Sequence, residues 1–369
     1  MTKIGVRKLW FQIHKWIGLI LAVLVIPISL TGAALVWHEP IEEAMHPERF
    51  AVSGPATLAP AAYADAARNA LGKGERLSRI EIPDAGPVTA TANKAGTGRP
   101  QRVTFYLDGA NGRLLGTERS GEGLFPLLHS LHGSLMIPGA GRSVVGWVGV
   151  AMLISSLTGL WLWWPLSGSL KRGFRWKRHR NTDTNLHYLV GFWVSLPLFV
   201  LSLTGVWISF PPVFAGLDGP RAGTPDRGAM ARAKPLDAPV TSLAVATANA
   251  NAVAPGRIVA ITWPTERKRE WAIDIARGQG APATITVKDA DGTAKPSPAR
   301  AQPSTWARTM RVVHDGTGMP LLWQLILFLG GIIPAILAVT GIIMWWRARG
   351  WRGELAGRAG GGIGQPSSA

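Results

Sequence analysis

Histidine is the residue type of this chain best suited to carry chemistry, because the sequence contains no cysteine. The absence of thiols excludes disulfides, cysteine-ligated iron–sulfur clusters and covalently attached c-type haem. A metal ion or haem group would therefore depend on His, Met or oxygen ligands. Of the eight histidines, six lie at or near the ends of long apolar runs: His14, His38, His129, His132, His187 and His314.

A four-residue motif recurs once in each of the four apolar runs. It reads Ser-Leu-Thr-Gly at 29–32, 156–159 and 202–205, and Ala-Val-Thr-Gly at 338–341. Small residues, Thr and Gly allow helices to approach closely in lipid, where the Thr hydroxyl bonds to the backbone or to a neighbouring helix. We therefore assign the motifs a helix-packing role.

Four histidines follow the same repeat. His14 and His187 each precede the Thr of the motif in their own run by 17 residues, and His132 and His314 each precede the Thr of the next motif by 26 residues. The first run thus corresponds to the third and the second to the fourth. This self-similarity predicts a tandem duplication of a two-span unit.

The apolar runs themselves predict an α-helical membrane protein. Each is about twenty residues or longer and almost free of charge, which as a helix is enough to cross a hydrocarbon core of roughly 30 Å. The chain is 47% hydrophobic and has 17 Trp but only 3 Tyr. We expect four transmembrane helices, the first an uncleaved anchor, from the runs Trp16–Trp37, Val144–Trp164, His187–Phe210 and Leu321–Trp346.

Charge gives the orientation of the four-helix core. Basic residues dominate 1–16, 165–186 and 347–369, whereas 38–143 and 211–320 mix both signs. Short cytoplasmic segments carry excess Lys and Arg, so both termini and the middle loop should face the cytoplasm of a bacterium, with the long segments in the periplasm. The net charge of +17 then reflects topology in the inner membrane. We expect no nucleic-acid partner, because the basic residues sit at membrane edges.

The chain is therefore divided into eight segments. They are 1–37 (cytoplasmic N-terminus and first span), 38–143 (first periplasmic domain), 144–164 (second span), 165–186 (cytoplasmic loop), 187–210 (third span), 211–320 (second periplasmic domain), 321–346 (fourth span) and 347–369 (cytoplasmic tail).

Each periplasmic segment has the pattern of a small α+β domain, a helix followed by short strands. The first is predicted to contain a helix at 58–71 and strands at 79–82, 88–91, 103–107 and 113–115. The second is predicted to contain a helix at 241–252 and strands at 258–263, 271–275 and 284–287. We interpret 211–225 and 295–303 as linkers and 360–369 as a tail.

The paired histidines predict haem. If the halves pack about a pseudo-twofold axis along the membrane normal, His14 meets His187 near the cytoplasmic surface and His132 meets His314 near the periplasmic surface. Two imidazoles facing each other across an apolar interface suit a six-coordinate b-type haem, so we expect two haems. Gly18, and Gly191 in the other half, lie one helical turn beyond a paired histidine and would leave room for the macrocycle.

The second site is less symmetric than the first. Pro and Gly follow His132 and His314, which should therefore lie on a short interfacial helix or loop. His129 and His38 are reserve ligands, and Arg311, the counterpart of His129, is a candidate partner for a haem propionate. Mononuclear zinc catalysis is disfavoured because no His-Glu-x-x-His pattern occurs. No nucleotide-binding loop or flavin domain is apparent, so the electron donor would be a quinol or a separate cytoplasmic reductase.

The ordered set of motifs resembles the PepSY-associated transmembrane proteins, also called iron-regulated membrane proteins. The similarity covers nearly the whole chain and includes Leu9-Trp10 with His14-Lys15-Trp16, the Ser-Leu-Thr-Gly motifs, Leu131-His132-Gly133, the Gly159-to-Pro165 exit and Asn185-Leu186-His187. The resemblance implies two PepSY-like periplasmic domains. In the ferric-siderophore reductase branch it also implies two b-type haems, held here by His14, His187, His132 and His314, that reduce a ferric chelate and release Fe(II). The alternative is a non-enzymatic PepSY membrane module that binds a periplasmic peptide, protein or metal and regulates a partner. The visible spectrum distinguishes the two.

Overall fold

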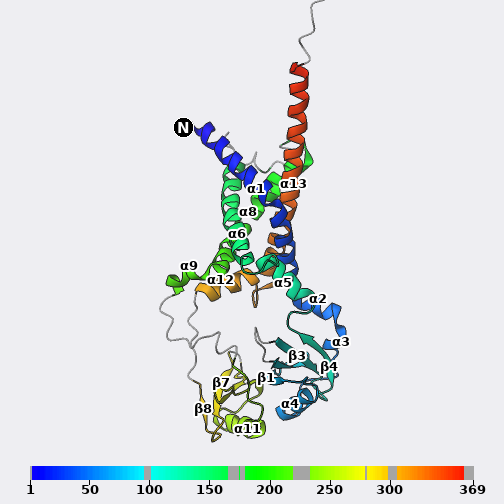
Figure 1. The fold of residues 1–369 in the computed structure, drawn as a ribbon, viewed down its shortest axis with the longest axis vertical. Helices are drawn as coiled ribbons and strands as arrows, with labels where there is room; N and C mark the ends of the chain where they lie inside the picture. Colours follow the sequence, from blue (N-terminus) through cyan, green and yellow to red (C-terminus); the bar gives the residue numbers. More distant parts are fainter. Residues whose placement is uncertain are drawn as a thin grey trace, which may run out of the picture. The chain divides into compact units, whose positions relative to one another are not determined.

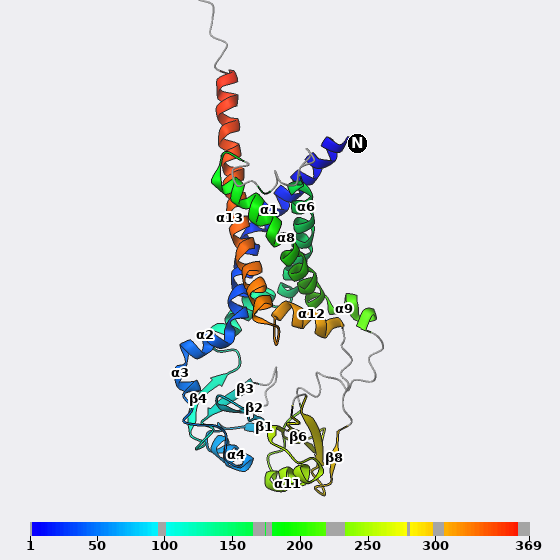
Figure 2. The same ribbon diagram turned by 180° about the vertical axis from the view of Figure 1, so that it is seen from behind.

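The computed structural model describes residues 2–94, 101–164, 174, 179–218, 233–278, 281–297 and 306–360. The chain forms two compact units. The helical unit comprises Met1–His38, Leu127–Pro220 and Ser304–Ala369, and the sheet unit comprises Glu39–Pro126 and Arg221–Pro303. Figures 1 and 2 show the elements of both from opposite sides.

Four long helices form the core of the helical unit, and each has an apolar segment long enough to cross a membrane. Helix α1 packs against α6 and α13, and α8 also packs against α6 and α13 (Figure 1). The protein is therefore a helical membrane protein, as predicted. The four helices are α1 (Lys3–Val36), α6 (Gly141–Trp163), α8 (Thr182–Ser209) and α13 (Leu321–Gly360).

Two of these helices extend well beyond the predicted apolar runs. Helix α1 begins at Lys3, where the Thr2 hydroxyl accepts a hydrogen bond from the Gly5 N–H (3.2 Å) and caps the first turn. Helix α13 continues past the apolar run to Gly360. Apolar periodicity marks the part of a helix that meets lipid, whereas the helix itself continues through charged residues at the membrane edge.

Helix pairs approach closely where a glycine removes a side chain. A Cβ atom added at Gly331 of α13 would lie 2.9 Å from the Ala33 Cβ and 3.0 Å from the Ser29 carbonyl oxygen of α1. A Cβ at Gly146 of α6 would lie 2.6 Å from the Phe210 ring. Glycines outside the Thr-Gly motifs thus carry much of the close helix packing.

Two short helices precede α6 and α13. They are α5 (Leu124–Ser134) and α12 (Trp306–Asp315), and α12 packs against α8 (Figure 2). The chain leaves α5 through two residues with positive φ, Leu135 and Met136, which redirects it before α6 begins. It leaves α12 through Gly316 and Gly318, which also have positive φ.

Several predicted loops take a different form or fall outside the described residues. The linker predicted at 211–225 is wrong at its start, where α9 (Pro211–Phe214) and a 3₁₀ turn (Ala215–Asp218) occur. Most of the basic stretch Lys171–Arg180, and the tail after Gly360, lie outside the described residues.

The sheet unit contains one antiparallel sheet of eight strands in the order β4-β3-β2-β1-β5-β6-β7-β8. Its first half follows α2 (His38–Met45) and α3 (Pro47–Phe50) and consists of α4 (Pro60–Asn69), β1 (Glu75–Glu81), β2 (Val88–Lys94), β3 (Gln101–Leu107) and β4 (Leu114–Arg119). Its second half consists of α11 (Leu243–Val253), β5 (Ile258–Thr262), β6 (Glu270–Ile275), β7 (Ala283–Lys288) and β8 (Ala294–Pro296).

The two segments predicted as α+β domains each have a helix followed by strands, and they join in one sheet. Strand β1 pairs with β5, with Ile80 opposite Ile261, so the two halves share one sheet and one hydrophobic core. The reason is physical: the first strand of each half would otherwise leave an open edge of unpaired backbone groups. The linker predicted at 295–303 is likewise wrong at its start, because Pro296 pairs with Ile285 as part of β8.

Candidate functional site

The helical unit brings four histidines together as two pairs. The rings of His14 (α1) and His187 (α8) have centres 6.4 Å apart and lie nearly perpendicular, at 85°. The rings of His132 (α5) and His314 (α12) have centres 6.1 Å apart, with an angle of 42° between their planes. These are the two pairs that the repeat spacing predicts, and His132 and His314 lie on the short helices expected for them.

The two pairs lie at different levels of the bundle. The His132 Nδ1 is 2.8 Å from the carbonyl oxygen of Ile28, which follows His14 by 14 residues on the same helix, α1. At a rise of 1.5 Å per residue this places the pairs roughly 20 Å apart along the helix. The pairs are therefore separate sites at different levels of the bundle.

Three of the four imidazoles bind a threonine of a Thr-Gly motif, each on a different helix. The Nδ1–Oγ1 distances are 3.0 Å for His14 and Thr158, 3.0 Å for His187 and Thr340, and 2.9 Å for His314 and Thr204. The fourth imidazole, His132, bonds to the carbonyl of Ile28, the residue just before the remaining motif. Each motif thus lies beside one histidine.

These contacts favour one tautomer of the imidazoles. The hydroxyls of Thr158, Thr204 and Thr340 each donate to the carbonyl oxygen four residues earlier, at 2.8, 2.8 and 3.0 Å. A hydroxyl that donates to its carbonyl can only accept from the imidazole, and this arrangement favours hydrogen on Nδ1. The Ile28 carbonyl also only accepts, so the same holds for His132. In this tautomer all four rings carry hydrogen on Nδ1 and leave the Nε2 lone pair available to a metal.

The glycine of each motif lies beneath an imidazole. A Cβ added at Gly32 would lie 2.6 Å from the Cε1 of His132, and one at Gly159 would lie 3.1 Å from the Cε1 of His14. The matching distances are 3.3 Å from Gly205 to His314 and 3.8 Å from Gly341 to His187. Sequence reasoning assigned the motifs to helix packing alone and missed this role. The sequence signal that could have revealed this role is that four motifs and four histidines recur with matching spacings.

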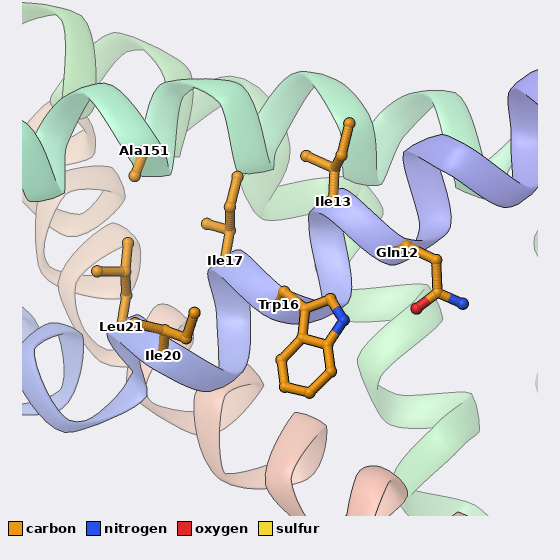
Figure 3. A pocket seen from close by; sticks show the side chains of 7 residues that line it. All are labelled: Gln12, Ile13, Trp16, Ile17, Ile20, Leu21 and Ala151. Carbon is orange, nitrogen blue, oxygen red and sulfur yellow. The ribbon is translucent and has the colours of Figure 1, made fainter.

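Open space surrounds the first pair. A Cβ at Gly18 would meet no atom within 4 Å, and one at Gly191 would meet only the Leu337 Cδ1, at 4.0 Å. Beside His14 an open groove of about 460 Å³ runs between α1 and α6, where Ile13 and Ile17 point toward the helix that carries Ala151 (Figure 3). Its other lining residues are Gln12, Trp16, Ile20 and Leu21. The groove is mostly apolar, and neither His14 nor His187 is among its lining residues.

The second pair is neutral at physiological pH. Burial first, and then nearby His132, lower the pKa of His314 to about 4. Burial also lowers the pKa of His132, whereas its bond to Ile28 opposes the shift. A neutral imidazole is the form that binds a metal.

The reserve residues lie outside both pairs. His129 is on α5, one turn before His132, and its charge contributes a further lowering of the His132 pKa. Arg311 is on α12 and forms a long ion pair of 4.0 Å with Asp315. His38 is the first residue of α2.

The donor set decides which metal group fits. In the part of the chain that the structure describes, no cluster of three or more His, Cys, Asp and Glu side chains is positioned to hold a bare metal ion. Two imidazoles on opposite sides of one metal would have ring centres about 6 Å apart, because each metal–nitrogen bond is about 2.0–2.1 Å. The observed spacings fit a haem with two axial histidines.

Fold and site together define a membrane protein with four apolar helices, two histidine pairs in the helical unit and a separate β-sheet unit. The family model described as "PepSY-associated TM region" matches residues 11–348. The chain therefore belongs to this family, as the motifs predicted. A comparison with individually characterised proteins finds no match.

Proposed function

We propose that the protein is a haem b electron-transfer protein of the bacterial inner membrane that reduces a ferric siderophore or similar ferric chelate in the periplasm. The observation that carries the proposal is the presence of two histidine pairs whose ring centres are 6.4 and 6.1 Å apart and whose Nε2 atoms are available. His14 and His187 would hold one haem, and His132 and His314 the other.

The chain's own residues orient the ligands. Nδ1 hydrogen bonds hold the rings, and Gly18 and Gly191 leave space where a larger side chain would obstruct the macrocycle. When bound, each haem iron takes up and gives up one electron. Two such sites, roughly 20 Å apart along the helix, would connect the two membrane surfaces, whereas one would not.

The proposed topology places both termini and the 165–186 loop in the cytoplasm and the sheet unit in the periplasm, and derives the helices from a tandem duplication. The excess of Lys and Arg in the short segments supports this orientation. Electrons would enter at the His14 pair, from a quinol or a cytoplasmic reductase, and leave at the His132 pair. One electron reduces one Fe(III) to Fe(II), which hard oxygen ligands of the chelate hold much less tightly.

The first experiment is the visible spectrum and haem content of the purified protein. We expect a b-type Soret band that shifts on reduction, and two haems per chain. His14→Ala and His187→Ala should each remove one haem, and His132→Ala and His314→Ala should each remove the other. His129→Ala and His38→Ala are matched controls that should keep both. A protein without haem would contradict the proposal and favour the regulatory-module alternative.

The second experiment tests the reductase step. Proteoliposomes containing chemically reduced protein receive an external, membrane-impermeant ferric chelate. Reoxidation of haem should accompany the appearance of Fe(II) outside, one iron for each electron. Haem that remains reduced with every chelate tried would show that the protein is a cytochrome without this activity.

A further inference from the structure

We propose that Thr158, Thr204 and Thr340 are positioning residues that set the redox potential of the haems through the Nδ1 atoms of their ligands. The inference rests on the proposed function, because it concerns the same histidines. It adds specific residues, a direction of effect and an internal control, which the ligand assignment alone does not supply.

Each threonine stands in the middle of a two-bond chain. The imidazole Nδ1–H donates to the hydroxyl, and the hydroxyl donates to a carbonyl one turn earlier, with lengths of 3.0 and 2.8 Å at His14 and Thr158. Donating to the carbonyl polarises the hydroxyl oxygen and makes it a better acceptor. Hydrogen bonding at the far nitrogen increases the basicity of the ligating nitrogen and fixes the ring orientation.

The direction of the effect follows. A more basic imidazole donates more electron density and stabilises Fe(III) relative to Fe(II), which lowers the potential. Removing the hydroxyl should therefore raise the potential of the haem concerned and weaken haem binding, by roughly 10-fold or more for a lost partner of this kind.

The remaining motif supplies the control, because its Thr hydroxyl is not hydrogen-bonded to a histidine. At all four motifs the backbone carbonyl three residues before the Thr also bonds to the imidazole, so only the hydroxyl contact distinguishes Thr31 from the other three. The Thr31 hydroxyl donates to the carbonyl oxygens of Pro27 (2.6 Å) and Ile28 (3.1 Å), while His132 donates directly to the Ile28 carbonyl (2.8 Å). A backbone carbonyl is not removed by a side-chain substitution. Thr31 thus has the same type, motif and buried setting as the other three, but its hydroxyl is not the acceptor for the histidine.

The experiment is a potentiometric titration of Thr→Val variants, which replace the hydroxyl by a methyl of similar size. Thr158→Val and Thr340→Val should raise the potential of the haem that His14→Ala removes. Thr204→Val should raise that of the haem that His314→Ala removes. Thr31→Val should leave both potentials unchanged. Thr→Ser at the three active positions should restore wild-type values, and Thr→Ala is a second variant wherever a Val variant does not fold.

Low-spin ferric EPR spectra provide an independent readout, because they report on axial imidazole orientation and basicity. Shifted g values in the three Val variants, restored by Ser, support the proposal. Wild-type potentials and spectra in all three would overturn it, as would an equal shift in Thr31→Val, which would indicate a packing effect. If the wild-type protein contains no haem, the proposed function fails first, and the two failures are distinguishable.

Discussion

Substituting alanine for the glycine of each motif tests how closely the imidazoles pack on these glycines. The four sites form a series, because the distance from the added Cβ to the imidazole differs from site to site. At Gly32 the new Cβ would lie 2.6 Å from the His132 Cε1 and 2.9 Å from its Nδ1. Carbon atoms in favourable contact are about 3.5–4.0 Å apart, so the ring must move by about 1 Å. Overpacking of this kind costs about 1–3 kcal/mol, and a displaced Nδ1 also loses a hydrogen bond to Ile28 worth about 0.5–1.5 kcal/mol.

The destabilisation by overpacking is opposed by a gain in helix propensity. Ala in place of Gly within a helix stabilises it by roughly 0.5–1 kcal/mol. At Gly341 the new Cβ would lie 3.8 Å from the His187 Cε1, an ordinary contact, so this gain should dominate. At Gly159 (3.1 Å) and Gly205 (3.3 Å) the two terms should nearly cancel. The expected order of stability is Gly341→Ala, then Gly205→Ala and Gly159→Ala, then Gly32→Ala.

The assay is thermal unfolding of the solubilised full chain together with haem content. Gly32→Ala should unfold at a lower temperature than wild type and lose the haem of the His132 pair, while Gly341→Ala keeps both haems. Equal stability of Gly32→Ala and Gly341→Ala would refute the contact geometry. The unfolding measurement remains valid in a haem-free protein, so it tests the structure apart from the proposed function.

Three further predictions concern the space beside Gly18, the core of the sheet unit at Trp271 and the charge of Asp108. Gly18→Leu should remove the haem of the His14 pair without lowering the unfolding temperature of haem-free protein, because the added side chain enters open space; an equal loss from the other pair would contradict this. Trp271→Ala, at a side chain that is 1% exposed and bonded to the Thr241 carbonyl, should destabilise the sheet unit by about 3–5 kcal/mol in denaturant unfolding. Hydrogen bonds, first from the Ser53 hydroxyl, lower the pKa of Asp108. The ionised Asp108 carboxylate should therefore stabilise the folded sheet unit above pH ~4, and this stabilisation should be lost as the pH falls below that value. Asp108→Asn should remove this contribution to the pH dependence of the free energy of unfolding.

The sequence predicted the elements that depend on local chemistry. Four apolar runs of sufficient length indicated four membrane helices, and equal offsets from the Thr of each motif indicated which histidines meet. Both signals come from residues close in the chain, or from a spacing that the repeat preserves. The family followed from the same motifs and is shown by the match over residues 11–348.

What the sequence did not predict depends on contacts between distant segments. Nothing local to β1 or β5 indicates that Ile80 lies opposite Ile261, because the partner of an edge strand is decided by the rest of the fold. Strand β8 is three residues long and contains Pro296, which is typical of an edge strand and resembles a linker in sequence. The contacts between histidines and motifs also cross between helices. Spacing alone could not tell whether Thr158 faces a neighbouring helix or an imidazole.

The distribution of contacts between the two halves explains why both are needed for one site. His14 bonds to Thr158 and His132 to Ile28, all within the first half of the chain, and the second half repeats this with its own histidines and threonines. Each half therefore orients one imidazole at each level of the bundle by itself. The rings that face each other, in contrast, always come from different halves. A group bound between them would contact both halves at both levels, so its binding free energy would stabilise the association of the halves. Removing it should loosen the packing between the halves while leaving each histidine bonded within its own half.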